Sequence, residues 1–151
     1  MCIRDRDANG CYWLNPADDL VVYYLESIAK ELYALGFDEV VFDGFEFPVS
    51  DSIVYPSGFS KEETLGACAV QLQQALADTG ILLSFGTQEP LVVPSAYRIY
   101  LTSSDGSEVA DLTAAISGVL DDPSTQIVFL TTSRDTRFQA YGVLLPLIEP
   151  Q

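Results

Sequence analysis

The sequence predicts an α/β domain built on a parallel sheet. Segments with helical spacing of apolar residues alternate along the chain with short, uninterrupted apolar runs. This alternation is typical of strands joined by crossover helices. The chain has 151 residues, of which 48% are hydrophobic and 11% aromatic, so it is long and apolar enough for one packed domain.

The first helix is predicted to begin at Asn15, with Asn as N-cap and Pro16 in the first turn. Gly36 should end it. One apolar stripe joins these limits, formed by Val21, Tyr24, Ile28, Leu32 and Leu35. Residues 38–47 follow as a strand that ends before Pro48. Its run Val40-Val41-Phe42 indicates a strand buried on both faces.

The second helix begins with a capping box, in which Ser60 and Glu63 have the S-x-x-E spacing. Gly80 should end it. Its apolar stripe consists of Leu65, Cys68, Leu72 and Leu76. On such a stripe Cys68 is interpreted as a small buried apolar residue rather than a nucleophile.

The rest of the chain continues the alternation. Strands are predicted at 81–85, 97–101, 127–130 and 143–147, with a helix from Asp105 to Val119. The connection 87–96 departs from the pattern, because Pro90 and Pro94 leave no room for a crossover helix. Ten residues are near the lower limit for a parallel connection, so an antiparallel pair is the alternative there.

Composition excludes several functions. The chain has 7 basic and 22 acidic residues, a formal charge of −15, and no histidine. Histidine-dependent triads and histidine-ligated metals are therefore excluded, and nucleic acid is a poor partner. The three cysteines lack CxxC spacing, no phosphate-binding or dinucleotide motif occurs, and no apolar run is long enough to span a bilayer.

We expect no cofactor and no metal. Residues 104–108 faintly suggest a calcium loop, but a turn with an N-cap explains them more simply.

Residues 1–6, MCIRDR, are interpreted as a non-native terminus. They resemble the translated adaptor sequence often found at the start of metagenomic reading frames. A genuine, charged and flexible terminus is the alternative. We leave these residues out of the fold prediction, so the domain is taken as 7–151. On this interpretation the missing signal peptide says nothing about secretion.

Two motifs carry a resemblance to a known family. Residues 13–16 read WLNP and open the first helix, and residues 36–48 read GFDEVVFDGFEFP. In order and spacing they resemble a bacterial family of glycoside hydrolase domains with a (β/α)₈-barrel fold. In that family a WxNP turn precedes a helix and a GFDEIxFDYVRFP strand, commonly taken as the fourth of the barrel. The resemblance is strongest over 13–48, extends to residue 85, and is weak beyond it.

The resemblance implies a partial barrel. A complete (β/α)₈ barrel needs about 250 residues, whereas this chain supplies four or five strand units. It would therefore be the C-terminal part of a barrel whose N-terminal strands are missing. The strand with Val40 to Phe42 would then be an open edge, and we expect poor solubility for the chain expressed alone.

The resemblance also implies catalytic carboxylates at the carboxyl ends of the strands. Asp43 follows the apolar run and is the candidate nucleophile or base, with a strand-end carboxylate bonded to backbone amides as the alternative. Glu46 is the nearest partner, but three residues along an extended strand span about 10 Å, so the pair needs a break at Gly44. The family has Tyr where Gly44 stands and Arg where Glu46 stands.

A second carboxylate is sought on another strand end. Asp105 follows the strand 97–101 and is either a general acid or a helix N-cap. Asp135 and Glu89 are weaker candidates. Rings at strand ends are the candidate sugar-binding residues, namely Trp13, Tyr55 and Phe45, with a place in the core as the alternative for Phe45.

Three functions are compatible with the sequence. The first is a glycoside hydrolase fragment that acts on a poly- or oligosaccharide without a metal. The second is a catalytically degenerate barrel that binds carbohydrate or serves the cell envelope. The third is an unrelated small α/β domain. The family resemblance alone favours an extracytoplasmic location.

Overall fold

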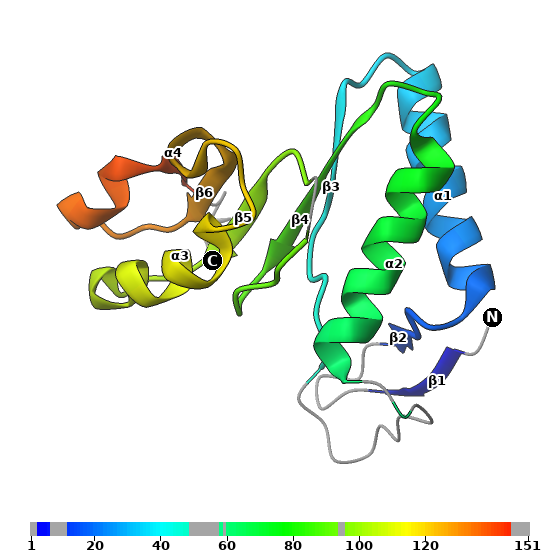
Figure 1. The fold of residues 1–151 in the computed structure, drawn as a ribbon, viewed down its shortest axis with the longest axis horizontal. Helices are drawn as coiled ribbons and strands as arrows, with labels where there is room; N and C mark the ends of the chain where they lie inside the picture. Colours follow the sequence, from blue (N-terminus) through cyan, green and yellow to red (C-terminus); the bar gives the residue numbers. More distant parts are fainter. Residues whose placement is uncertain (1–2, 7–11, 49–57, 59, 94–95, 146–151) are drawn as a thin grey trace, which may run out of the picture. The chain divides into compact units, whose positions relative to one another are not determined.

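The computed structural model describes residues 3–6, 12–48, 58, 60–93 and 96–145 (Figure 1). The chain divides into two compact units. The first unit comprises residues 1–40 and 46–81, and the second comprises residues 41–45 and 82–151.

The first unit begins with a two-stranded antiparallel sheet. Strand β1 (Ile3–Arg6) pairs with β2 (Tyr12–Leu14), and the register shifts between Arg4 and Arg6. The sequence did not predict this pairing, because residues 1–6 were left out of the expected fold.

The N-cap of helix α1 (Asp19–Ala34) lies three residues later than predicted. Asp18 is its N-cap, and the carboxylate accepts a hydrogen bond from the Leu20 amide at 2.9 Å. The predicted cap, Asn15, instead accepts from the Ala17 amide and closes a turn before the helix. Both Asn and Asp are good N-cap residues. Asp18 is the N-cap because the helix begins directly after it. The prediction of Asn15 was therefore wrong.

The end of α1 is as predicted. Gly36 has a φ of +95°, and its amide donates to the Tyr33 carbonyl while the Phe37 amide donates to the Leu32 carbonyl. This is a Schellman ending, which needs a residue in the left-handed region. The buried face of α1 differs from the predicted stripe. Val21 and Ala29 are buried, whereas Tyr24 and Leu35 are 46% and 70% exposed.

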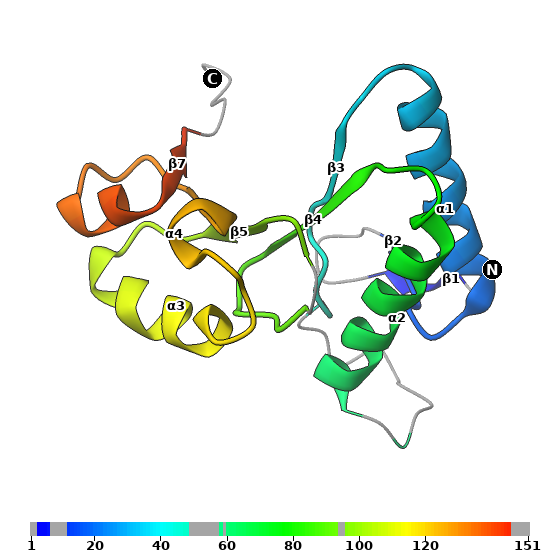
Figure 2. The ribbon, with the colours of Figure 1, turned by 45° about the horizontal axis from the view of Figure 1, so that its top comes forward.

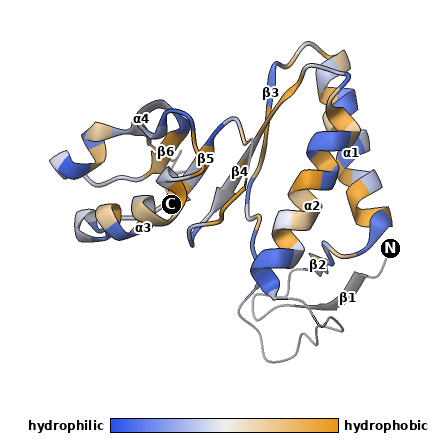
Figure 3. Cartoon of the chain, viewed as in Figure 1, coloured by the Kyte–Doolittle hydropathy of each residue, from blue (hydrophilic) through white to orange (hydrophobic). Residues whose placement is uncertain are grey.

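Helix α2 (Lys61–Leu76) confirms the capping box. The Ser60 hydroxyl accepts from the Glu63 amide at 3.1 Å, and the Glu63 carboxylate accepts from the Ser60 amide at 2.8 Å. All four residues of its predicted stripe are buried. Burial raises the pKa of the Cys68 thiol to about 11, which agrees with a packing role. Helices α1 and α2 lie side by side (Figures 1 and 2), and the first turn of α2 is hydrophilic (Figure 3).

Strand β3 (Glu39–Phe42) is shorter than predicted and passes from the first unit into the second. It ends at a turn over Asp43 and Gly44, where Gly44 has a φ of +63°. Val40 is buried, but its neighbour Val41 is 40% exposed. The prediction that this strand is buried on both faces was therefore wrong, since successive side chains point to opposite faces and only one is covered.

The main sheet has five strands in the order β3-β4-β5-β6-β7. Its second-unit strands are β4 (Leu82–Thr87), β5 (Ile99–Thr102), β6 (Ile127–Leu130) and β7 (Gly142–Leu144). The pairs β4–β5, β5–β6 and β6–β7 are all parallel. The predicted parallel sheet is thus confirmed, with β3 and β7 at its edges.

The connection from β4 to β5 joins two parallel strands, so the alternative of an antiparallel pair was wrong. It contains no helix among its described residues, which are all of 88–98 except 94 and 95. Leu91 and Val93 of this connection are buried. The Gln126 amide donates to the carbonyls of Ala96 and Tyr97 and so holds the start of β5.

Short helices complete the second unit. A 3₁₀ turn, η1 (Gly106–Glu108), leads into α3 (Val109–Ser117), so the helix predicted over 105–119 is present but shorter. Two elements were not predicted, α4 (Pro123–Gln126) and the 3₁₀ helix η2 (Thr136–Ala140). Phe138 of η2 is buried against Phe129 of β6.

The described strands form an open sheet, and a barrel is not confirmed. What the structure supports is the coarser class, a mixed α/β fold with a parallel sheet. None of the helices it describes is long and apolar enough to cross a membrane.

Candidate functional site

Acidic side chains follow four neighbouring strands at the points where the strands end. Asp43 comes directly after β3, Glu89 follows β4, Asp105 follows β5 and Asp135 follows β6. All four belong to the second unit. The carboxyl ends of parallel strands meet at one edge of a sheet, which is where α/β enzymes bind their ligands. The sequence-predicted carboxylates Asp43 and Asp105 therefore belong to the same edge.

Asp43 is exposed and lies in the turn that leaves β3. Its Oδ1 atom accepts a hydrogen bond from the Gly44 amide at 2.9 Å. The next residue, Phe45, donates its amide to the Gly86 carbonyl of β4, also at 2.9 Å. The turn is thus bonded to the neighbouring strand, and the Asp43 carboxylate lies close to the carboxyl end of β4.

A pairing of Glu46 with Asp43 needs a break in the strand at Gly44, and Glu46 lies beyond that break. The strand ends at Phe42, and the positive φ of Gly44 turns the chain before Glu46 is reached. Glu46 is half-buried and belongs to the first unit. Its pairing with Asp43 stays a prediction.

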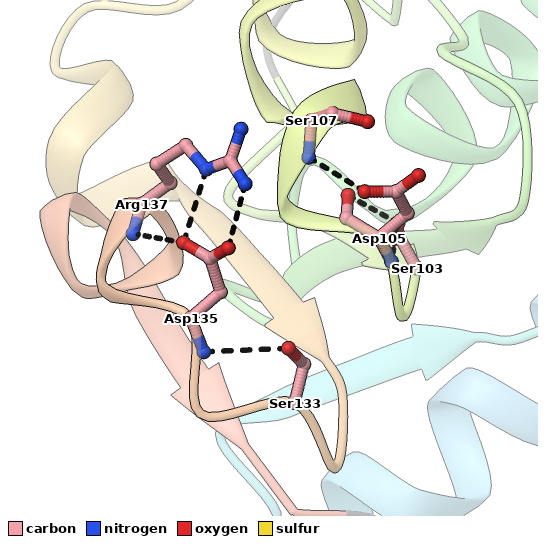
Figure 4. Close-up of polar contacts among 6 residues, drawn as sticks. All are labelled: Ser103, Asp105, Ser107, Ser133, Asp135 and Arg137. Atoms are coloured by element: carbon pink, nitrogen blue, oxygen red, sulfur yellow. Dashed lines mark hydrogen bonds and ion pairs between the residues drawn. The ribbon is translucent and has the colours of Figure 1, made fainter.

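Asp105 is the N-cap of η1 (Figure 4). Its Oδ1 atom accepts from the Ser107 amide at 2.8 Å, and its own amide donates to the Ser103 hydroxyl at 3.3 Å. Hydrogen bonds from the backbone and side chain of Ser107, aided by the charge of Arg137, hold the pKa of Asp105 below its usual value. The ionised form is therefore favoured, which is the opposite of what a resting general acid requires.

Asp135 repeats this arrangement on the next strand. Its amide donates to the Ser133 hydroxyl at 3.3 Å, and its Oδ1 atom accepts from the Arg137 amide at 2.9 Å. The Arg137 guanidinium also binds both carboxylate oxygens, with Nε 3.0 Å from Oδ1 and Nη2 2.7 Å from Oδ2 (Figure 4). This two-point contact lowers the pKa of Asp135 to about 2.

The two loops are in contact. An added Cβ atom on Gly106 would overlap the Asp135 side chain, so a larger residue would have to displace Asp135 where the loops meet. Sequence analysis missed this double loop, although a signal was present. Ser-x-Asp occurs at 103–105 and again at 133–135, each time a few residues after an apolar strand.

The candidate sugar-binding rings differ in accessibility. Phe45 is only 8% exposed and its ring packs on Phe85 at 4.8 Å, which fits the core alternative. Trp13 is half-buried on β2, and its ring centroid lies 5.1 Å from that of Phe47. Tyr55 lies outside the described residues. In the part of the chain that the structure describes, no group of three or more Cys, Asp or Glu side chains is placed to hold a metal ion.

Comparison with known proteins gives one informative match. Residues 5–88 match the model of a family described as "Putative glycosyl hydrolase domain". The matched segment includes both predicted motifs and ends just after β4. No curated protein and no solved structure matches the chain.

Proposed function

Because the chain belongs to this family of glycosyl hydrolase domains, we propose that it hydrolyses glycosidic bonds of a poly- or oligosaccharide with Asp43 as nucleophile or base. The observation that carries the proposal is the position of Asp43. It lies within the matched residues and follows a strand of a parallel sheet directly. Its carboxylate lies beside β4 at the edge where such folds place their active sites.

The chemistry needs a second carboxylate. Glycosidases use one ionised group and one proton donor, about 5–5.5 Å apart for retention and about 6.5–9.5 Å apart for inversion. We propose Asp105 as the second group, because it follows β5, two strands from β3 in the sheet. Neighbouring strands are about 4.8 Å apart, so two strand spacings come to about 10 Å between backbones. Side chains that lean toward each other would bring the carboxyl groups closer together.

The proton-donor role of Asp105 depends on bound substrate. The pKa of this carboxyl is low while water and Ser107 surround it. A sugar that covers the loop would exclude water and disfavour the charged form, which raises the pKa. If Asp105 is the acid, hydrolysis should fall in Asp105→Asn, because the amide cannot donate the proton that the carboxyl group donates.

We also propose that the chain is the C-terminal part of a (β/α)₈ barrel. Among the described residues the sheet has five strands rather than eight, and β3 and β7 are its edge strands. An edge strand presents backbone amide and carbonyl groups that a further strand can pair.

The alternative is a degenerate barrel that binds carbohydrate without cleaving it. Gly44 and Glu46 stand where the family pattern has Tyr and Arg, and this departure favours the alternative. A binding module needs aromatic rings that stack on sugars, but it needs no proton donor.

One experiment separates the two functions. The parent chain, Asp43→Asn and the control Asp121→Asn would be compared for release of reducing sugar from a panel of soluble polysaccharides. Asp121 is exposed and precedes β6, away from the carboxyl ends. We expect hydrolysis by the parent and the control, and a loss of about 10²- to 10⁴-fold in Asp43→Asn. Binding of the same polysaccharide should persist in all three. Binding without hydrolysis in the parent would establish the module and refute the enzyme.

A further inference from the structure

Gly86 is the last residue but one of β4, and the turn after β3 lies against it. The Phe45 amide donates to the Gly86 carbonyl at 2.9 Å. The adjacent residue, Phe85, is fully buried and packs against the rings of Phe42 and Phe45, with centroids 6.0 and 4.8 Å away. The end of β3 and the turn after it are therefore held to the end of β4 by one backbone hydrogen bond and two ring contacts.

The space at Gly86 is occupied by Asp43. Successive residues of a strand point to opposite faces, so the position of the missing side chain lies opposite the ring of Phe85. An ideal Cβ atom on Gly86 would lie 2.5 Å from Asp43 Oδ1, 3.2 Å from its Cα and 3.4 Å from its Cγ. Ordinary contacts between carbon atoms are about 3.5–4.0 Å. A side chain at this position would displace the carboxylate.

Backbone conformation does not explain this glycine. Positive φ angles occur at Gly36, Gly44 and Gly80, and Gly86 is not among them. A glycine inside a strand costs stability and commonly marks a close approach by other atoms. Here the approaching atoms belong to the proposed catalytic carboxylate.

We propose that Gly86 is a positioning residue that lets the Asp43 carboxylate lie directly on the backbone of β4. The missing side chain leaves the space that Oδ1 occupies, and the Gly44 amide donates a hydrogen bond to the same atom. Displacement by even a methyl group would move the carboxylate relative to a bound sugar, and misplacement of about 1 Å can cost about 10²-fold in rate. The catalytic consequence rests on the proposed function, whereas the geometric claim does not.

The test is a double-mutant cycle of Gly86→Ala and Asp43→Ala, with Gly118→Ala as the matched control. Gly118 has no atom within 4 Å of its ideal Cβ position and has a helical φ of −72°, so a methyl group fits there. The full chain is used throughout. The melting temperature is measured for every variant, and the ¹³C shift of the Asp43 carboxyl and the ¹⁵N–¹H signal of Gly44 are measured wherever Asp43 is present.

We expect Gly86→Ala to lower the melting temperature and to shift both NMR signals. In the Asp43→Ala background, which lacks Oδ1 and Cγ, the same substitution should lower the melting temperature by roughly half as much or less. Gly118→Ala should leave both signals unchanged. If Gly86→Ala alone fails to fold, a folded double variant supports the proposal and an unfolded one overturns it.

Equal losses of melting temperature in the two backgrounds, or unchanged Asp43 and Gly44 signals in Gly86→Ala, would also overturn it. Kinetics then separate this inference from the proposed function. If the parent hydrolyses a polysaccharide, Gly86→Ala should lower kcat by about 10²-fold with KM little changed. If the parent hydrolyses nothing, the proposed function fails, and the cycle and the NMR signals still decide whether Gly86 positions Asp43.

Discussion

Phe138 links the Asp135 loop to the core of the second unit, and its removal tests that part of the fold. The side chain is 1% exposed, and its ring meets the ring of Phe129 edge-on, with centroids 5.0 Å apart and planes at 68°. The Phe138 amide also donates to the Asp135 carbonyl. Truncation of this side chain would therefore leave a cavity between η2 and β6.

The expected cost of Phe138→Ala is large. Replacing a buried Phe by Ala costs about 3–5 kcal/mol, of which the edge-to-face contact supplies about 0.5–1.5 kcal/mol. A domain is stable by only about 5–15 kcal/mol, so the variant should unfold at clearly lower urea concentrations. Urea unfolding followed by far-UV circular dichroism measures this difference. The near-UV signal should also weaken, because Tyr141 packs on the same Phe129 ring at 5.7 Å.

Phe37→Ala is the matched control, since Phe37 is 55% exposed. It should change the free energy of unfolding by no more than about 0.5 kcal/mol. A cost for Phe138→Ala as small as that of the control would show that η2 does not pack on β6. The description of the Asp135 loop would then be wrong.

Two further predictions concern a capping box and a charge. Ser60→Ala removes one hydrogen bond of the α2 capping box and should cost about 1 kcal/mol, within a range of about 0.5–2 kcal/mol. Urea unfolding measures the cost, and Ser60→Asp, which keeps a capping oxygen, should recover most of it. Asp135 has a folded pKa of about 2, below the value of about 3.9 expected in the unfolded chain. The unfolded state therefore binds more protons in this range, so the stabilisation is present above about pH 4 and is lost as pH falls toward 2. Melting temperatures from pH 6 to 2 should fall less steeply in Asp135→Asn than in the parent, and identical slopes would contradict the assigned ion pair with Arg137.

Local signals in the sequence predicted the parts of this fold that depend on near neighbours. The capping box at Ser60 and the Schellman ending at Gly36 are formed as expected, because their hydrogen bonds join residues only a few positions apart. The strand 127–130 was predicted with its observed bounds, since a short apolar run between polar segments has few alternatives. The start of α1 failed because two good caps, Asn15 and Asp18, lie within one turn of each other.

The candidate site was predicted in part. That Asp43 and Asp105 follow strands is visible in the sequence, because each comes directly or shortly after an apolar run. The sequence could not tell that Asp105 is held ionised by Ser107, nor that Phe45 is buried on Phe85. Both facts depend on the backbone conformation of the turn after each strand. A change at one residue of that turn points the following side chains in another direction and so changes their contacts.

The sequence by itself determined the alternation of the longer helices with apolar strands, the capping box of α2, the glycine that ends α1, and the acidic residues that follow the strands. Those features arise from interactions between residues that are close together in the sequence, so they can be predicted from a short stretch of it. Only the tertiary structure decided that β4 and β5 are parallel without a helix between them, that Val41 is exposed, and that Asp43 lies on Gly86. Asp43 and Gly86 are far apart in the chain, and they meet because β3 and β4 are neighbours in the sheet.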